Sequence, residues 1–592
     1  MSLPANQPPG LDETFHVALV GELSHRFPPE IPYLLGTRLD YHWFVHAQVA
    51  AGRWATGVDA EALLRQLMPA TMLTLTVLGL GAVALRLTGR PVAAIVAPAL
   101  MVAGAFHLFG PHYPVESVTE PFLMRRYMSS PSQSYGVMMS MPALMLILEV
   151  LRPDRPVAKL TWLTLAAALL ALSGSKATFL PIFLCGAIAV WALQVLWQRR
   201  VDRRATLLVV LLALVTVFAQ QVLFGGQTGG LAVDLFGTVE VTLRAQGLQQ
   251  TVVSSTLMTA ALLVGWLLYG AGVVGLALER RWRDPRAIWM LVCIPAGITV
   301  AFVFFRTGLS QLWFQRSVAE LVVLVSAWGA AWLLPNPLSR RTAFGLLAIA
   351  GVGGLGAFTV SVGVEAVNNG APVATLGSLL LTTMAPFVLV GGYLLVRLRL
   401  GCAAGYRRPG PTVCLTLLLG LGLTNVFAFF ATDTSTPQPV AKLPVLFAAG
   451  GAKAAEYIEA NSDADDVVAT NMHCALPDDR RCDNRHFWVS GFSQRRVVIE
   501  GWGYTAVTND KFVSDQRNRT IPAPFPKRLA INDAVFERPS ARSVGRLVDT
   551  YDVRWLFVST KYPADVDGLS QVSPVLSEVF RNNSYVVFEV SD

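Results

Sequence analysis

Nine carboxylate and imidazole side chains lie close together in a short N-terminal stretch of a chain that is otherwise poor in charge. Five carboxylates and four imidazoles lie between Asp12 and His46. Asp12 and His16 are four residues apart, so a helix would place them on one face. A carboxylate beside apolar surface has a raised pKa and can accept a proton from a hydroxyl group. The spacing therefore indicates a general base, with Asp12 as the first candidate and Glu13 as the second.

The same cluster has a simpler interpretation. Groups of charged residues usually form solvated faces, and the "PPEIP" sequence that closes the stretch would end a helix. Residues 10–30 would then form a polar loop that caps the rest of the protein. The two interpretations differ in whether activity depends on Asp12.

A second polar stretch, residues 110–136, combines acidic and basic groups. Glu116 and Glu120 could complete an acceptor site, and Arg125 and Arg126 could hold a phosphate through charge-assisted hydrogen bonds. Alternatively, the stretch is an amphipathic interfacial segment whose arginines contact lipid headgroups. A headgroup and a lipid-phosphate substrate need the same residues, so both interpretations stay open.

Three isolated basic residues lie at the ends of apolar runs. They are Lys176 in "SGSKATFLP", and Arg306 and Arg316 around "FFRTGLSQLWFQRS". A charge at membrane depth is costly and indicates function, although a long side chain at a helix end can reach water instead. We interpret these residues as candidate contacts to a donor phosphate.

Two cysteines lie close together in a polar region. Cys474 and Cys482 are accompanied by His473 and His486, which is enough for a zinc ion, but the spacing matches no strong zinc pattern. In an oxidising compartment a disulfide is the simpler prediction.

The elements that must position these residues are mostly membrane helices. Hydrophobic residues make up 53% of the 592-residue chain and charged residues 15%, against about 25% charged in soluble proteins. Long apolar runs without strand-like alternation predict helices rather than a barrel. We predict about twelve spans, at residues 65–86, 91–109, 135–152, 157–173, 177–197, 205–224, 252–278, 287–305, 315–334, 343–362, 375–397 and 412–431.

Loop charge predicts how these spans are oriented. One alternate set of connections, including "WQRRVDRR", "ERRWRDPR" and "PLSRR", holds 19 basic residues, whereas the other set holds 6. The basic set is predicted to be cytoplasmic. Both ends of the chain are then extracytoplasmic. Residues 1–15 contain no signal peptide to export the first loop, so we expect a transmembrane helix upstream that this chain lacks.

The C-terminal part of the chain is predicted to form one α/β domain. Strands are predicted at 467–470, 495–501, 553–559 and 585–590, which are rich in β-branched and aromatic residues. The predicted organisation is a first extracytoplasmic loop (1–64), a transmembrane domain (65–431) and an extracytoplasmic α/β domain (432–592). The formal charge of +8 lies in short loops and does not suggest nucleic acid.

Two motifs in the first loop resemble a known family. "LDETFH" is similar to the acidic motif of protein O-mannosyltransferases and their bacterial relatives, within the GT-C superfamily of membrane glycosyltransferases. "DYHWFVHAQVAA" stands where that family has an Asp-x-His-Pro-Pro region, although the two prolines are missing here. The resemblance implies a polyprenyl-phosphate-linked sugar donor, with Asp12 as the base and His16, Asp40 and His42 near the substrate.

The resulting prediction is a bacterial inner-membrane glycosyltransferase. It would transfer a sugar, with inversion, from the lipid-linked donor to an extracytoplasmic acceptor of the cell envelope. No cofactor is expected to be required, although the carboxylates and imidazoles are suitable ligands for Mg²⁺ or Mn²⁺. The alternatives are a transporter or flippase for a lipid-linked glycan, and a non-catalytic membrane scaffold with an outer binding domain. Nearly charge-free spans argue against ion-coupled transport.

Overall fold

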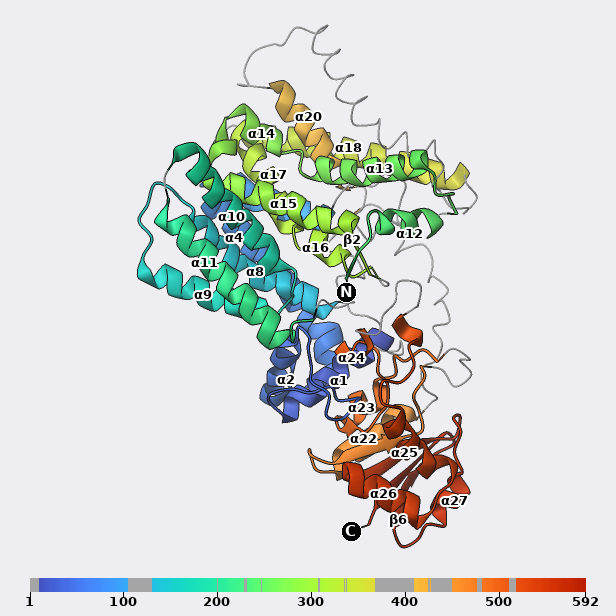
Figure 1. Cartoon of the computed structure of the whole chain (residues 1–592). Coiled ribbons are helices and arrows are strands. Elements are labelled where there is room, and N and C mark those ends of the chain that lie inside the picture. Colours follow the sequence, from blue (N-terminus) through green and yellow to red (C-terminus); the bar gives the residue numbers. More distant parts are fainter. Residues whose placement is uncertain are drawn as a thin grey trace. The chain divides into compact units, whose positions relative to one another are not determined.

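The protein folds into two compact units (Figure 1). The computed structural model describes residues 10–104, 130–199, 201–227, 231–245, 247–306, 309–334, 336, 338–367, 409–423, 426, 450–475, 482–509 and 518–591. The loop–sheet unit comprises Met1–Thr71, Gln220–Gly230 and Gln438–Asp592, and the helical unit comprises Met72–Ala219 and Leu231–Pro437.

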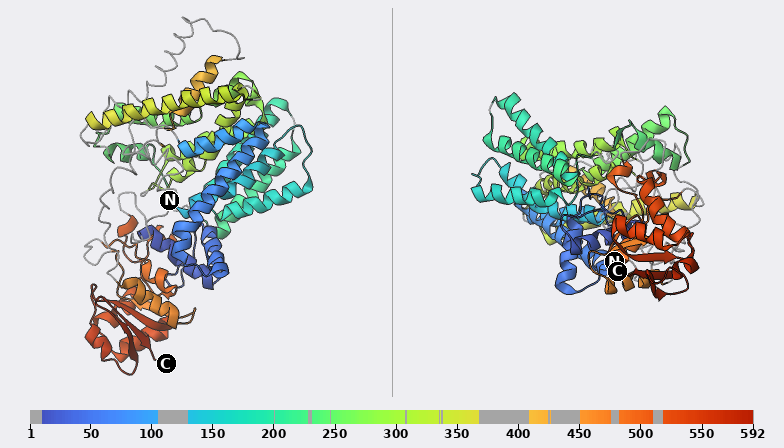
Figure 2. Two further views of the ribbon diagram at one scale, coloured as in Figure 1. Left: turned by 180° about the vertical axis from the view of Figure 1, so that it is seen from behind. Right: turned by 60° about the horizontal axis from the view of Figure 1, so that its bottom comes forward.

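The helical unit consists of apolar helices. In the described part of the chain, eight helices are long and apolar enough to cross a membrane, and two shorter apolar helices accompany them. Helices α8, α9, α10 and α11 run side by side (Figure 2). The long elements are α4 (Met68–Thr88), α5 (Pro91–Ala103), α8 (Pro131–Val150), α9 (Lys159–Ser173), α10 (Phe179–Gln198), α11 (Arg203–Phe218), α13 (Val252–Tyr269), α15 (Pro285–Val303), α17 (Ala319–Leu333), α18 (Arg340–Val367) and α20 (Pro409–Gly420).

Short elements join these helices. They are η2 (Ala219–Leu223), β1 (Ala232–Val233), α12 (Gly237–Ala245), α14 (Val273–Leu278), η3 (Arg281–Arg283), β2 (Phe304–Phe305) and α16 (Leu312–Arg316). Strands β1 and β2 form a two-stranded antiparallel pair. The predicted span 375–397 lies outside the described residues, as do residues 424, 425 and 427–431 of the span 412–431.

One predicted span, 252–278, is two helices in the structure. Helix α13 ends at Tyr269 and α14 begins at Val273. Between them, the backbone approaches α17 so closely that a Cβ atom on Gly272 would lie 2.1 Å from the Ser326 carbonyl oxygen. Small residues let membrane helices touch through their backbones. The break therefore reflects close helix packing, which hydropathy alone does not report.

The loop–sheet unit contains a five-stranded sheet in the order β4-β3-β5-β7-β6. Strands β3, β4 and β5 are parallel, and β7 and β6 add antiparallel partners on one side. Three predicted strands match β3, β5 and β7 to the residue, and β4 is shorter than predicted. The strands are β3 (Val467–Thr470), β4 (Arg496–Val497), β5 (Val553–Ser559), β6 (Leu576–Arg581) and β7 (Tyr585–Val590).

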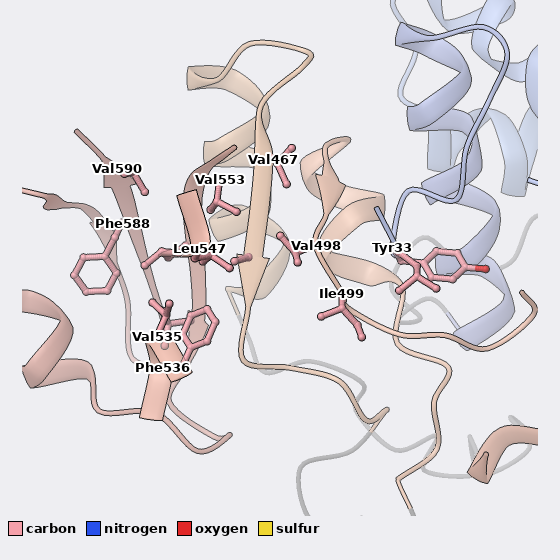
Figure 3. Packing of buried hydrophobic residues seen from close by; sticks show 14 of the residues in the cluster. Tyr33, Val467, Val498, Ile499, Val535, Phe536, Leu547, Val553, Phe588 and Val590 are labelled. Carbon is pink, nitrogen blue, oxygen red and sulfur yellow. The ribbon is translucent and has the colours of Figure 1, made fainter. Parts of the chain in front are cut away.

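Helices cover both faces of this sheet. One hydrophobic cluster joins the sheet to α22 and α23, and a second joins it to α25, α26 and α27. Figure 3 shows Val535, Phe536 and Leu547 packed beside Val553 and Phe588 in the second cluster. The elements outside the sheet are α1 (Leu11–His25), α2 (Phe44–Thr56), α3 (Ala60–Ala62), η1 (Leu63–Leu67), α22 (Gly451–Asn461), α23 (Trp488–Ser493), α24 (Ala506–Asn509), η4 (Asn518–Thr520), α25 (Pro526–Glu537), α26 (Ala541–Tyr551) and α27 (Val566–Ser570).

The N-terminal segment belongs to the same unit as the sheet. Phe15 and Leu19 of α1, together with Tyr33 from the following loop, are buried in the second cluster alongside sheet residues. A buried ion pair adds to this contact, since the Glu22 carboxylate binds the Arg496 guanidinium of β4. Residues nearly 500 positions apart in sequence therefore share one core.

Candidate functional site

Helix α1 carries the acidic pair, and its two members have different environments. The Glu13 carboxylate accepts the Gly10 backbone N–H at 2.7 Å, which caps the helix. It also lies 3.9 Å from the Arg65 guanidinium. Glu13 is thus committed to holding the start of the helix.

Asp12 is exposed and is oriented by a side chain from the sheet domain. The Tyr504 hydroxyl donates a 2.6 Å hydrogen bond to Asp12 Oδ1. Burial, and then the charge of Asp12, raises the pKa of Tyr504, so the phenol remains a donor at neutral pH. Arg485 lies beside Tyr504 and is itself held by two hydrogen bonds to Asp483 at 2.8 and 2.6 Å. An accessible carboxylate in a fixed orientation can act as a base.

An aromatic cluster supports this arrangement. The Phe15 ring lies 5.2 Å from both Tyr41 and Tyr504, edge to face, and Phe487 lies 5.6 Å from Tyr504, measured between ring centroids. Tyr33 packs 4.5 Å from Phe487 and donates its hydroxyl proton to a backbone carbonyl. Edge-to-face pairs add stability beyond area burial. The cluster therefore fixes the start of α1 against the turn that carries Tyr504.

His16 lies one helical turn beyond Asp12 but faces inward. Its Nδ1 is 2.8 Å from Nε2 of His46 on α2, and both rings are buried. One nitrogen must donate and the other accept, so this contact requires at least one neutral imidazole. Burial, and then the charge of His16, lowers the pKa of His46 well below its usual value. The pair joins α1 to α2.

The remaining predicted residues of the first loop are half-buried. Asp40 pairs with Arg38 at 3.0 Å and contacts the backbone of the 220–230 segment, because a Cβ atom on Gly225 would lie 2.6 Å from its carboxylate. The His42 ring lies 3.8 Å from that of Tyr41. Asp40 therefore shapes the fold around the acidic helix, and His42 continues the aromatic cluster.

In the helical unit, Lys176 is buried in the turn before α10. Its ammonium donates to the Ser132 hydroxyl at 3.2 Å and lies 4.4 Å from the centroid of the Trp313 ring. Burial, and then the charge of Arg316, lowers the pKa of Lys176 to about 7. A buried amine of this kind gains strongly from an added negative charge.

Arg316 contacts the same indole. Its guanidinium carbon lies 4.4 Å from the Trp313 centroid, so the ring contacts both cations. Arg306 is half-buried, and its backbone N–H donates to the Gln311 side chain at 3.2 Å. The structure thus brings Lys176 and Arg316 together around Trp313, a contact that the sequence alone does not predict. Two cations that lie on one aromatic ring can both donate charge-assisted hydrogen bonds to a phosphate.

A polar track continues from Lys176 into the helical unit. Gln133 donates to the Ser317 hydroxyl at 3.2 Å, and Thr178 Oγ lies 2.6 Å from the same oxygen. In the first turn of α17, Glu320 is fully buried and accepts a 3.4 Å hydrogen bond from Ser140. Sequence reasoning missed Glu320 because a single acidic residue hardly lowers the hydropathy of its span.

The remaining predictions concern the 110–136 stretch, the cysteine pair and a metal ion. Glu116, Glu120, Arg125 and Arg126 lie outside the described residues. Cys474 and Cys482 form a disulfide with a 2.06 Å bond. Among the described residues, no group of three or more His, Cys, Asp or Glu side chains is arranged to hold a metal ion.

Comparison with solved structures gives distant likenesses. Similar solved structures include ArnT from Cupriavidus metallidurans in the apo state, at 14% identity, and the same protein bound to undecaprenyl phosphate, at 13%. Each match covers 98% of this chain and 93% of the other, with a TM-score of 0.45. No family model and no curated protein matches this chain. At this identity and TM-score, the likeness assigns neither an activity nor a site residue.

Proposed function

We propose that this chain is an integral membrane glycosyltransferase that moves a sugar from a polyprenyl-phosphate donor to an extracytoplasmic acceptor. The observation that carries the proposal is the state of Asp12. It is exposed, begins a helix and is oriented by Tyr504 at 2.6 Å, whereas the adjacent Glu13 is occupied by capping. One member of the acidic pair is thus free for a reaction and the other holds the helix.

The proposed donor site uses the cations around Trp313. A donor phosphate would accept hydrogen bonds from Lys176 and Arg316, and the apolar helices around it would accommodate the polyprenyl chain. A low-dielectric setting strengthens such charge-assisted contacts. The proposal rests on these residues, because the likeness to other structures is too distant to support it.

The proposed reaction is a single displacement. The acceptor hydroxyl gives its proton to the Asp12 carboxylate while its oxygen attacks the anomeric carbon of the sugar. The bond between that carbon and the phosphate oxygen breaks, and the polyprenyl phosphate leaves with the electron pair. Attack opposite the leaving group inverts the anomeric centre. Basic groups that bind the phosphate stabilise the charge that develops on it.

The test is sugar transfer in membranes that contain the full chain. A panel of radiolabelled polyprenyl-phosphate sugars is supplied, and incorporation is compared among wild type, Asp12→Asn and Glu13→Gln. Loss of a general base reduces the rate by about 10²–10⁴-fold, so Asp12→Asn should be nearly inactive while Glu13→Gln keeps most activity. Equal incorporation by wild type and Asp12→Asn refutes the proposed base and favours a scaffold.

One observation favours a second candidate, a transporter of a lipid-linked glycan. Glu320 is a fully buried carboxyl within a span, and intramembrane ionisable groups often line transport paths. This alternative predicts that Glu320→Gln abolishes transbilayer movement of the lipid in proteoliposomes while Asp12→Asn does not. If the chain is a transferase, Asp12→Asn should instead abolish sugar transfer.

A further inference from the structure

A cavity of about 280 Å³ lies between helices α18 and α20 of the helical unit. Its walls are mostly apolar, but one end is polar and carries an arginine. The lining residues are Arg341, Thr342, Gly345, Leu346 and Ile349 of α18, with Thr412 and Val413 of α20. These residues take no part in the proposed reaction.

Helix packing explains the shape of the cavity. A Cβ atom on Gly420 would lie 2.4 Å from the Ala350 carbonyl oxygen, so α18 and α20 touch there. All lining residues precede this contact along their helices, which leaves space toward the two N-termini. Gly345 forms part of the wall, and a Cβ atom there would meet nothing within 4 Å.

The polar end of the cavity is electropositive. Arg341 lies in the first turn of a 28-residue helix, where the helix dipole also favours an anion. Within the described part of the chain, no acidic residue lines the cavity. An anionic group is therefore complementary to this end, whereas the ammonium of a zwitterionic headgroup would lie beside Arg341 without a carboxylate.

The helix surface beside the cavity is apolar and exposed. Only 17% of the most apolar 18-residue stretch of α18 is buried inside the protein. Phe344 and Leu347, which lie beside the cavity on the same helix, are 73% and 68% exposed. Loop charge predicts that α18 and α20 both begin at the cytoplasmic face. Basic pockets between membrane helices on that face are suited to lipid headgroups.

We propose that this cavity binds an anionic phospholipid. The phosphate lies against Arg341 and the start of α18, and Thr342 supplies a hydroxyl donor. One acyl chain begins along Gly345, Leu346 and Ile349 and continues over the exposed apolar side chains of α18. The cavity is too small for a whole lipid, so it holds the part nearest the headgroup. This site is separate from the donor site and does not depend on the proposed reaction.

The test is native mass spectrometry of the full chain in detergent, titrated with phosphatidylglycerol or with phosphatidylcholine of the same acyl composition. One basic residue at a membrane surface contributes about fivefold in affinity for an anionic lipid. Wild type should therefore prefer phosphatidylglycerol about fivefold. Arg341→Ala should remove that preference and leave phosphatidylcholine binding unchanged. Gly345→Trp should block both lipids by filling the cavity.

Two matched variants serve as controls. Arg203→Ala removes an exposed arginine from the first turn of α11, and Gly356→Trp adds an indole to an open position of α18 far from the cavity. Both should bind lipid as wild type does. The proposal is overturned if wild type binds the two lipids equally, or if Arg341→Ala and Gly345→Trp match their controls. Displacement of bound phosphatidylglycerol by inorganic phosphate would also overturn it, because the site would then recognise a soluble anion.

Discussion

Replacing Lys176 with methionine should stabilise the protein and impair donor binding at the same time. The ammonium is buried, and its pKa of about 7 lies well below the usual value of 10.5. The difference corresponds to roughly 5 kcal/mol of disfavoured charging, at about 1.4 kcal/mol for each pKa unit. Methionine has a similar length and carries no charge, so it removes this cost.

The gain in stability depends on pH. The unfolded chain binds more protons than the folded one between pH 7 and 10.5, so the free energy of unfolding of wild type rises across that range. Below pH 7 Lys176 is charged in both the folded and the unfolded chain, so the full cost of burying its ammonium is present. Lost contacts to Ser132 and Trp313 offset roughly 1–3 kcal/mol of the gain. Lys176→Met should therefore raise the melting temperature at pH 6 and have little or the opposite effect at pH 10.

Donor binding should follow the charged fraction of Lys176. A polyprenyl-phosphate sugar is a phosphodiester whose single charge is constant over this range, so only the protein titrates. If the charged amine is the binding form, the apparent Kd rises about twofold at pH 7 and about tenfold at pH 8 relative to its low-pH limit. We expect this rise in wild type and a flat, weak profile in Lys176→Met.

The assay combines thermal unfolding in detergent with fluorescence titration of a labelled polyprenyl-phosphate sugar without acceptor, from pH 6 to 9. Lys176→Arg is the control, since arginine stays charged throughout. It should bind donor with a flat profile and gain no stability. Two results would refute the reasoning: a wild-type Kd that does not change between pH 6 and 9, or a Lys176→Met variant that melts lower than wild type at pH 6.

Three further predictions concern the N-terminal segment. Glu13→Ala should cost about 1 kcal/mol of stability because the helix loses its cap, measured by chemical unfolding, with transfer activity largely retained. Tyr504→Phe should lower kcat about tenfold without changing donor affinity, because the Asp12 carboxylate loses the hydrogen bond that orients it; an unchanged kcat would exclude this role. Burial, and then the charge of His16, holds the pKa of His46 below that of the unfolded chain, so stability is complete above about pH 6.5 and falls as the pH drops further. His46→Leu should flatten the acid side of the melting-temperature profile.

Sequence reasoning predicted the elements whose signals are local. Apolar runs identified most of the membrane helices, and β-branched runs identified β3, β5 and β7. Strand β6 was missed because Leu576–Arg581 alternates polar and apolar residues weakly and lies at an exposed sheet edge. The single long span at 252–278 was wrong because its interruption depends on a glycine contact with another helix.

The candidate site was harder to predict because its partners are distant in sequence. Asp12 and Glu13 look alike in the sequence, and only the capping bond of Glu13 and the Tyr504 bond of Asp12 separate their roles. Tyr504 lies in the aromatic "GWGY" turn, but nothing local connects that turn to Asp12. In the same way, only the fold shows that Lys176 and Arg316 contact one indole.

The shared core of α1 and the sheet domain has a consequence for biosynthesis. Phe15 leaves the ribosome long before Phe487, its ring partner at 5.5 Å. At about 5–20 residues per second, the delay is roughly half a minute to a minute and a half. During this time the apolar face of α1 has no sheet to pack on and is open to proteases and chaperones. A premature stop before the sheet domain would therefore leave Asp12 on an unsupported helix, even though every membrane helix had already been made.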